Sequence, residues 1–112
     1  MSAADATVAV QLTARSWSVI DATMDNTAAN ARNGLDYATE DVALAIRQAG
    51  QEQVPWVDGQ WPPMEQILTI RLSTADWNFA IGQVRQSLER PVDDETESLE
   101  RTVLEEVTPQ LG

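Results

Sequence analysis

The chain has 112 residues, of which eighteen are acidic and seven are basic, and every basic residue is an arginine. Its formal net charge of −11 disfavours binding to nucleic acids and to anionic membrane surfaces, because both are negatively charged. The absence of cysteine and histidine excludes disulfide bonds and thiolate zinc sites, and it removes the commonest general base and metal ligand.

The first predicted element is a strand over residues 8–12, in which apolar Val8, Val10 and Leu12 alternate with small or polar residues. Thr13 follows it as the predicted N-cap of a helix. One face of that helix carries Trp17, Ile20, Met24 and Ala28. We expect the helix to end at Asn33-Gly34, with the glycine in the left-handed conformation of a C-cap.

A second helix is predicted from Leu35 to Gly50, with an apolar face made of Leu35, Ala38, Val42, Ala45 and Ile46. Residues 51–66 then contain three prolines, two tryptophans and Asp58-Gly59, which predicts an irregular linker with a tight turn. Large aromatic residues are enriched at interface hot spots. The candidate partner-binding residues are therefore Trp56, Trp61, Pro62, Pro63 and Met64. The alternative is that both tryptophans fold back and fill a small core.

The stretch 67–88 reads as a strand that runs directly into a helix. Its apolar positions Leu68, Ile70 and Leu72 alternate with polar ones, and Ser73 is the predicted N-cap, with Asp76 three residues later. The helix carries Trp77, Ala80, Ile81, Val84 and Leu88 on one face, and Pro91 prevents its continuation. An acidic start and the apolar residues Leu99, Val103 and Val107 predict a last amphipathic helix.

Shifting the chain by sixty residues aligns its two halves without a gap. Val10 then falls on Ile70, Thr13 on Ser73, and Trp17 on Trp77. We therefore predict a single domain over residues 1–112 with pseudo-repeats at about 8–50 and 68–108. The expected fold class is α+β and mostly helical, a duplicated strand-helix-helix unit with about four helices and a short two-stranded antiparallel ribbon.

A strand followed by two helices, present twice, resembles the ribbon-helix-helix architecture of dimeric DNA-binding repressors and antitoxins, here within one chain. The resemblance covers roughly Val8 to Gly50 and Leu68 to Val107. It implies that the outward side chains of the paired strands enter the major groove and that the start of each second helix holds a phosphate. The base readers that it implies are Gln11, Thr13, Thr69, Arg71 and Ser73.

Two sets of acidic residues are candidates for a chemical site. Asp21 and Asp25 lie one helical turn apart, which suits a divalent cation or acid-base work, but without histidine or a further facing glutamate we interpret the pair as a solvated helix face. The cluster at 93–97 lacks the ligand spacing and glycine of a calcium loop. No base accompanies the serines, and no phosphate-binding glycine pattern occurs. We predict no catalytic residues, no metal site and no cofactor.

These features favour a small, acidic, non-enzymatic protein-interaction module. Its expected partner is another protein, and self-association into a homodimer is expected because a two-stranded sheet leaves open edges. The alternatives are a nucleic-acid-binding regulator or antitoxin of the ribbon-helix-helix type, and an acidic mimic of nucleic acid. The start MSAADATVAV does not resemble a signal peptide and no segment reads as a membrane span, so a cytoplasmic location is expected.

Overall fold

The computed structural model describes residues 6–111 and confirms the α+β fold class. The elements are β1 (Thr7–Thr13), α1 (Ala14–Asn33), α2 (Tyr37–Gln53), β2 (Ile67–Ser73), α3 (Thr74–Leu88), α4 (Asp94–Val107) and the short 3-10 helix η2 (Thr108–Gln110). The order strand-helix-helix thus occurs twice, while the duplication of one ancestral unit stays a prediction.

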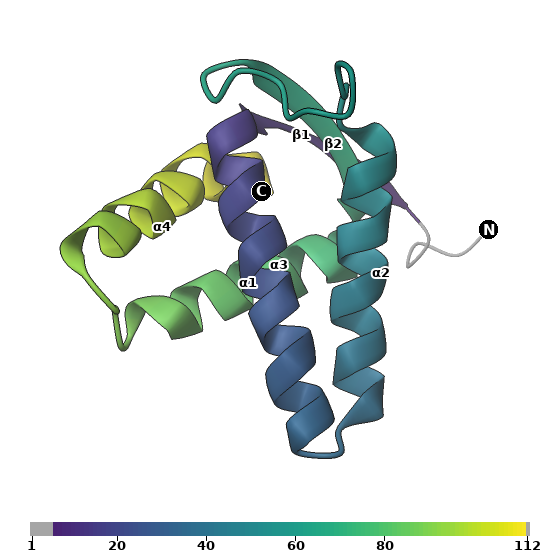
Figure 1. Cartoon of the computed structure of the whole chain (residues 1–112), viewed down its shortest axis with the longest axis vertical. Helices are drawn as coiled ribbons and strands as arrows, with labels where there is room; N and C mark the ends of the chain where they lie inside the picture. The colour runs from purple at the N-terminus through teal and green to yellow at the C-terminus, as the bar shows by residue number, and fades with distance from the viewer. Residues whose placement is uncertain (1–5, 112) are drawn as a thin grey trace.

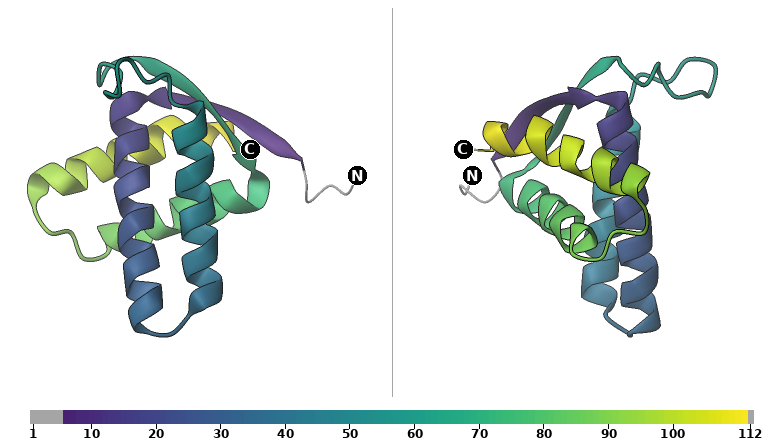
Figure 2. Two further views of the ribbon diagram at one scale, coloured as in Figure 1. Left: turned by 45° about the vertical axis from the view of Figure 1, so that its right-hand side comes forward. Right: turned by 90° about the vertical axis from the view of Figure 1, so that its left-hand side faces the viewer.

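The two strands form an antiparallel ribbon. Val10 lies opposite Ile70 at the centre, and Thr7 and Thr13 lie opposite Ser73 and Ile67 at the ends. Alternation decides which face is buried, because successive side chains point to opposite sides of a strand. The core-facing residues are Val8, Val10, Leu12, Leu68, Ile70 and Leu72. The helices cover this face, and the other face of the ribbon is open (Figure 2).

A glutamine side chain closes each edge of the ribbon at one residue. Gln53 at the end of α2 accepts a hydrogen bond from the Arg71 backbone N–H (2.7 Å) and donates one to the Arg71 carbonyl oxygen (2.8 Å). Gln110 in η2 makes the same two bonds to Gln11, at 2.9 and 2.6 Å. Each amide takes the place of a neighbouring strand, which protects a sheet edge. We call Gln53 and Gln110 the glutamine clamps.

Both helices that follow a strand begin at a side-chain cap, as the sequence predicts. The Thr13 hydroxyl accepts a hydrogen bond from the Ser16 N–H (3.1 Å), and the Ser73 hydroxyl accepts one from the Asp76 N–H (3.0 Å). Each bond satisfies one of the free N–H groups of a first helical turn. The caps therefore fix the direction in which α1 and α3 leave the ribbon.

Trp17 and Trp77 form the centre of the core, where they meet edge to face with ring centroids 6.3 Å apart. The Trp77 indole N–H donates to the Val8 carbonyl oxygen (2.9 Å), whereas the Trp17 indole N–H has no hydrogen-bond partner among the residues described. Gly50 of α2 packs directly on Trp17. A Cβ atom at that position would lie 1.8 Å from the Trp17 ring, so only glycine fits there.

The prediction for the second helix was wrong in its end and in its face. α2 continues past Gly50 to Gln53, because this glycine makes room for Trp17 and is not a helix stop. Its buried residues are Glu40, Ala43, Ile46 and Gly50, whereas Leu35 and Val42 are exposed. Glu40 can be buried because its carboxylate forms an ion pair with Arg32 of α1.

The turn between α1 and α2 also differs from the prediction. Gly34 caps α1 with an ordinary φ of −89°, and the left-handed conformation belongs to Leu35, with a φ of 62°. The turn closes through backbone hydrogen bonds from the N–H groups of Leu35 and Asp36 to carbonyls of the last turn of α1. The side chain of Leu35 is therefore held in solvent, at 72% exposure.

The helices differ in how they pack. α1 and α2 stand side by side as a long antiparallel hairpin, while α3 and α4 pack across one side of α1 (Figure 1). The ribbon lies at the end of the hairpin where α1 begins and α2 ends (Figure 1). No helix within residues 6–111 is both long and apolar enough to cross a lipid bilayer.

Candidate functional site

The five candidate partner-binding residues of the linker divide between core and surface. Pro62 is buried, so it is not available to a partner, contrary to the prediction. Trp61 and Met64 are half-buried. Trp61 packs against the hydrophobic core. Trp56 and Pro63 are exposed, with 41% of Trp56 accessible. Trp61 therefore folds back onto the core, whereas Trp56 stays exposed, and its partner binding stays a prediction.

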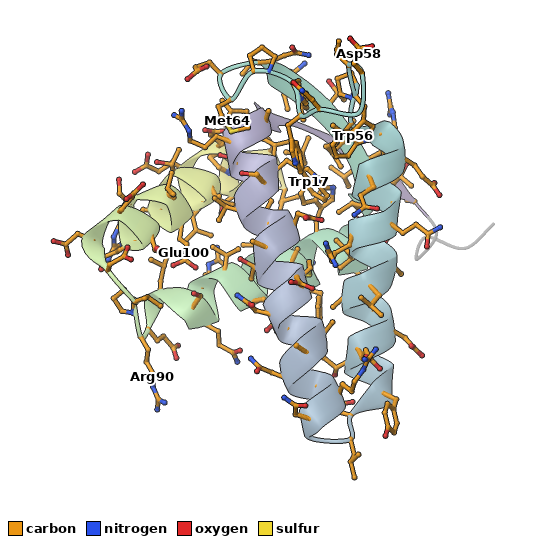
Figure 3. All side chains as sticks on the ribbon, in the orientation of Figure 1. Trp17, Trp56, Asp58, Met64, Arg90 and Glu100 are labelled. Atoms are coloured by element: carbon orange, nitrogen blue, oxygen red, sulfur yellow. The ribbon has the colours of Figure 1, made fainter. Side chains whose placement is uncertain are left out.

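The linker between α2 and β2 contains the predicted turn at Asp58-Gly59. Both residues have a positive φ, 51° and 76°, and Val57 pairs with Gln60 across them. Two successive positive φ angles are the mark of a type I′ hairpin turn. The loop projects from the body of the molecule, with Asp58 at its tip and Trp56 at its base beside the end of α2 (Figures 2 and 3).

Trp56 is exposed but held in place. Its indole N–H donates to the Gln51 carbonyl oxygen (2.8 Å), and its ring meets that of Trp61 at a centroid distance of 5.0 Å and a tilt of 55°. Trp61 is in turn seated on the core. The exposed ring is therefore supported from two sides.

The same ring closes one end of a hollow on the outer surface of α2. The hollow has a volume of about 600 Å³ and is lined by Leu44, Arg47, Gln48, Gln51, Glu52 and Trp56. We call it the Trp56 hollow. Leu44 is 39% exposed, so an aliphatic and an aromatic side chain both face solvent here. The other four lining residues are polar or charged, so the surface of the hollow is mixed.

The charges around the Trp56 hollow are mostly negative. Arg47 is its cation, and it forms ion pairs with Asp21 and Asp25 of α1, each at 3.2 Å. The hydrogen bond that Arg47 donates to the Asp21 carboxylate raises the pKa of Arg47 above its ordinary value. The carboxylates of Asp21 and Asp25 are thus both paired with an arginine. Glu52 has no ion-pair partner among residues 6–111 and accepts only a long hydrogen bond from Gln48 (3.4 Å).

The five candidate base readers also divide into two groups. Gln11, Thr69 and Arg71 are exposed on the open face of the ribbon, and Gln11 lies opposite Thr69. The hydroxyls of Thr13 and Ser73 instead cap α1 and α3, and Thr13 is also bonded to Glu106 through its N–H (2.8 Å).

The second helix of the N-terminal half, α2, begins far from this ribbon face. α1 has twenty residues and so carries the chain about 30 Å away from the ribbon before α2 starts. Figure 1 shows the α1–α2 turn at the bottom of the hairpin and the ribbon at the top. The start of α2 is therefore not beside the strands.

A second hollow, of about 640 Å³, lies between α1 and α3 and is almost wholly polar. The hydroxyls of two of its residues, Thr23 and Thr27, already donate to backbone carbonyls of their own helix. Its one apolar lining residue is Ala29. Within the described residues, no group of three or more acidic side chains is arranged as a metal site would require.

Sequence reasoning missed Leu44 and Glu52 as parts of a site, and it missed both glutamine clamps. The clamps carry no local signal, because each bonds to a strand that is distant along the chain. Leu44 and Glu52 do carry one, since positions 44, 47, 48, 51 and 52 of the hollow have the spacing of one helical face. In comparisons with known proteins, no family model, no curated protein and no solved structure matches the chain.

Proposed function

We propose that this protein is a non-enzymatic interaction module that docks another protein at the Trp56 hollow. The observation that supports the proposal is the exposed indole of Trp56, which is fixed by its bond to Gln51 and by Trp61. A side chain that is ordered before binding loses little conformational freedom on binding. Tryptophan is also among the residues that contribute most to protein interfaces.

A partner that adds a strand to the ribbon is a less favoured form of the same idea. The backbone groups of Gln11 and Arg71 that face outward are already bonded to the glutamine clamps. A further strand, including one from a second copy of the chain, would have to displace an amide at either edge. We therefore place the proposed docking site on α2 and the linker.

The test combines capture with a site-directed control. The protein and its Trp56→Ala variant are immobilised and exposed to lysate of the host, and captured proteins are then purified and titrated against both. The matched control is Tyr37→Ala, because Tyr37 is another exposed aromatic residue (55%) at the opposite end of α2.

We expect a protein that binds the wild type and the Tyr37→Ala variant equally and the Trp56→Ala variant at least about tenfold more weakly. Equal binding to all three proteins would contradict the proposed site. Failure to find any partner that depends on Trp56 would also count against it.

The open ribbon face carries a second candidate, nucleic-acid binding, because Gln11, Thr69 and Arg71 are all exposed on it. Arg71 also has no ion-pair partner among residues 6–111. Against this candidate stands the net charge of −11.

The measurement is a titration with mixed-sequence duplex DNA at low salt, followed by sedimentation. This candidate predicts a salt-sensitive complex that Arg71→Ala weakens and Arg85→Ala does not, since Arg85 is an exposed arginine on α3, outside the ribbon. Absence of a complex at low salt would remove the candidate.

A further inference from the structure

We propose that the Trp56 hollow takes the cationic side chain of an arginine or lysine in a basic segment of the partner protein. The inference rests on the proposed docking site and adds the chemistry of what is docked. It is carried by the juxtaposition of an exposed, fixed indole with the Glu52 carboxylate, which has no ion-pair partner among residues 6–111.

The aromatic part of the site can attract a cation through its ring face. An arginine or lysine head group within about 6 Å of an indole centroid is attracted by the negative charge of the ring face, and tryptophan is the best of the aromatic residues for this contact. The N–H of Trp56 is already engaged by Gln51, so the ring itself is what the indole offers to a ligand. Leu44 gives the aliphatic part of a long side chain an apolar surface.

The charged part of the site favours the same ligand. Arg47 lines the hollow but is neutralised by Asp21 and Asp25, with which it forms two ion pairs. Glu52 lines the hollow without any ion pair among the described residues, and Asp58 adds a further carboxylate on the loop that carries Trp56 (Figure 3). Two carboxylates therefore already pair with the Arg47 guanidinium, and the carboxylate of Glu52 is left to accept one more positive charge.

The rest of the molecule points the same way. With eighteen acidic residues against seven arginines, the protein attracts basic partners and repels acidic ones over a distance set by the ionic strength. The hollow is an open surface depression of about 600 Å³, so an occupant would lie along α2 and stay partly in solvent.

The experiment titrates the full chain with two capped peptides, Ser-Gly-Arg-Gly-Ser and the same peptide with citrulline in place of arginine. Citrulline keeps the shape of arginine and removes its charge. The signal is the indole N–H resonance of Trp56 in a ¹⁵N-labelled sample, identified among the four tryptophans by its loss in the Trp56→Leu variant.

We expect the arginine peptide to shift the Trp56 resonance in a saturable way and the citrulline peptide to bind about ten times more weakly. Trp56→Leu should weaken arginine-peptide binding by about tenfold, followed through the backbone resonances of α2, and Glu52→Gln by about threefold. Both side chains are exposed, so both variants should fold, and the backbone spectrum verifies this.

The matched control is Asp41→Asn, which removes one exposed carboxylate of the same helix about 16 Å from Glu52. It should leave the affinity unchanged, because a charge so distant is largely screened. Equal loss in Glu52→Gln and Asp41→Asn would mean that net charge and not the hollow binds the peptide, and would overturn the inference.

Two other outcomes separate the inference from the function on which it rests. Equal affinity for the citrulline peptide would overturn cation recognition and leave the hollow as an apolar docking site. No shift of Trp56 with either peptide would overturn the inference, while a captured partner that depends on Trp56 would still support the proposed function.

Discussion

The N-terminal half (β1, α1 and α2) and the C-terminal half (β2, α3 and α4) agree at the ribbon and differ away from it. Each strand has seven residues and leads at once into a helix capped by its own last residue, Thr13 or Ser73. Each first helix then buries a tryptophan at the same distance from its cap. Beyond these tryptophans the halves diverge, since α1 and α2 have 20 and 17 residues and α3 and α4 only 15 and 14.

The differences reach into the core. Glu40 of α2 and Glu100 of α4 lie sixty residues apart and are both buried, but only Glu40 has an arginine partner. One carboxylate oxygen of Glu100 has no hydrogen bond among the described residues, and Figure 3 places the side chain between α4 and α3. Trp17 is crowded by Gly50 without a bond for its N–H, while Trp77 is bonded to Val8.

This comparison teaches that the ribbon and its two caps are the shared requirement of the fold. Pairing of Val10 with Ile70 demands similar strands on both sides, whereas the helices need only fill the space below. The halves can therefore solve the packing of their second helices differently. Substitutions at equivalent positions of the two halves therefore measure how far the halves diverge.

The largest difference is expected between two helical glycines. Gly50→Ala should destabilise the protein by about 2–4 kcal/mol, because the added methyl group would overlap the Trp17 ring. Gly82→Ala in α3 should stabilise it by about 0.5–1 kcal/mol, because nothing lies within 4 Å of the new methyl group and alanine favours helix. Urea unfolding of both variants checks this. Equal effects would show that Trp17 moves aside.

The two buried glutamates should respond with opposite signs. Glu100→Met is expected to stabilise the protein by about 1–2 kcal/mol, because it replaces a carboxylate oxygen without a partner by an apolar group of similar length. Glu40→Met should cost about 0.5–1 kcal/mol, since it removes the ion pair with the largely exposed Arg32. Thermal unfolding at neutral pH measures both. A loss of stability in Glu100→Met would show that this carboxylate is satisfied by water.

The glutamine clamps should contribute equally in the two halves. Gln53→Ala and Gln110→Ala should each cost about 1 kcal/mol, because each removes two hydrogen bonds at an exposed edge. Gln51→Ala is the matched control, an exposed glutamine of α2 whose side chain forms no hydrogen bond within the described residues. Sedimentation should show stronger self-association of the double clamp variant than of the wild type. If it does not, the clamps do not guard the edges.

The smallest effect is expected from acid. Hydrogen bonds from Thr39, chiefly its hydroxyl, lower the pKa of Asp36, the N-cap of α2, and those from Thr96, chiefly its backbone N–H, lower the pKa of Asp93, the N-cap of α4. A carboxylate whose pKa is lower in the folded state stabilises the fold above its unfolded pKa. That contribution is lost as the pH falls below about 4 through the folded pKa.

Asn is a good N-cap that does not titrate in this range, so Asp36→Asn and Asp93→Asn should each flatten the fall in stability between pH 5 and pH 3. Urea midpoints across this range measure the slope. Unchanged slopes would assign the acid sensitivity to other carboxylates.

The strands, the two caps and the two core tryptophans could be predicted because each has a local signal. Alternation in residues 67–73 and the position of Ser73 before Trp77 need no knowledge of the rest of the chain. The face of α2 could not be predicted in this way. Glu40 and Gly50 look like surface and helix-stop residues, and only their partners Arg32 and Trp17 make them core positions.

The candidate site was predicted in outline only. Composition identifies the 51–66 linker as a candidate binding surface with large aromatic residues, but it does not distinguish Trp56 from Trp61. That distinction depends on how the loop folds back, which buries Pro62 and seats Trp61 on the core. Leu44 and Glu52 join the site because the loop returns to the outer surface of α2.

The clamp at Gln11 has a consequence for the kinetics of folding. Its two hydrogen bonds connect residues that are 99 positions apart, and the paired strand residues are separated by 54 positions (Thr13 and Ile67) to 66 positions (Thr7 and Ser73). Contacts so distant along the chain form slowly, because long loops must close first. The α1–α2 hairpin, whose contacts are local, should then form early. Pairing of the two strands should be the slow step, and the hydrogen bonds of Gln110 should form last.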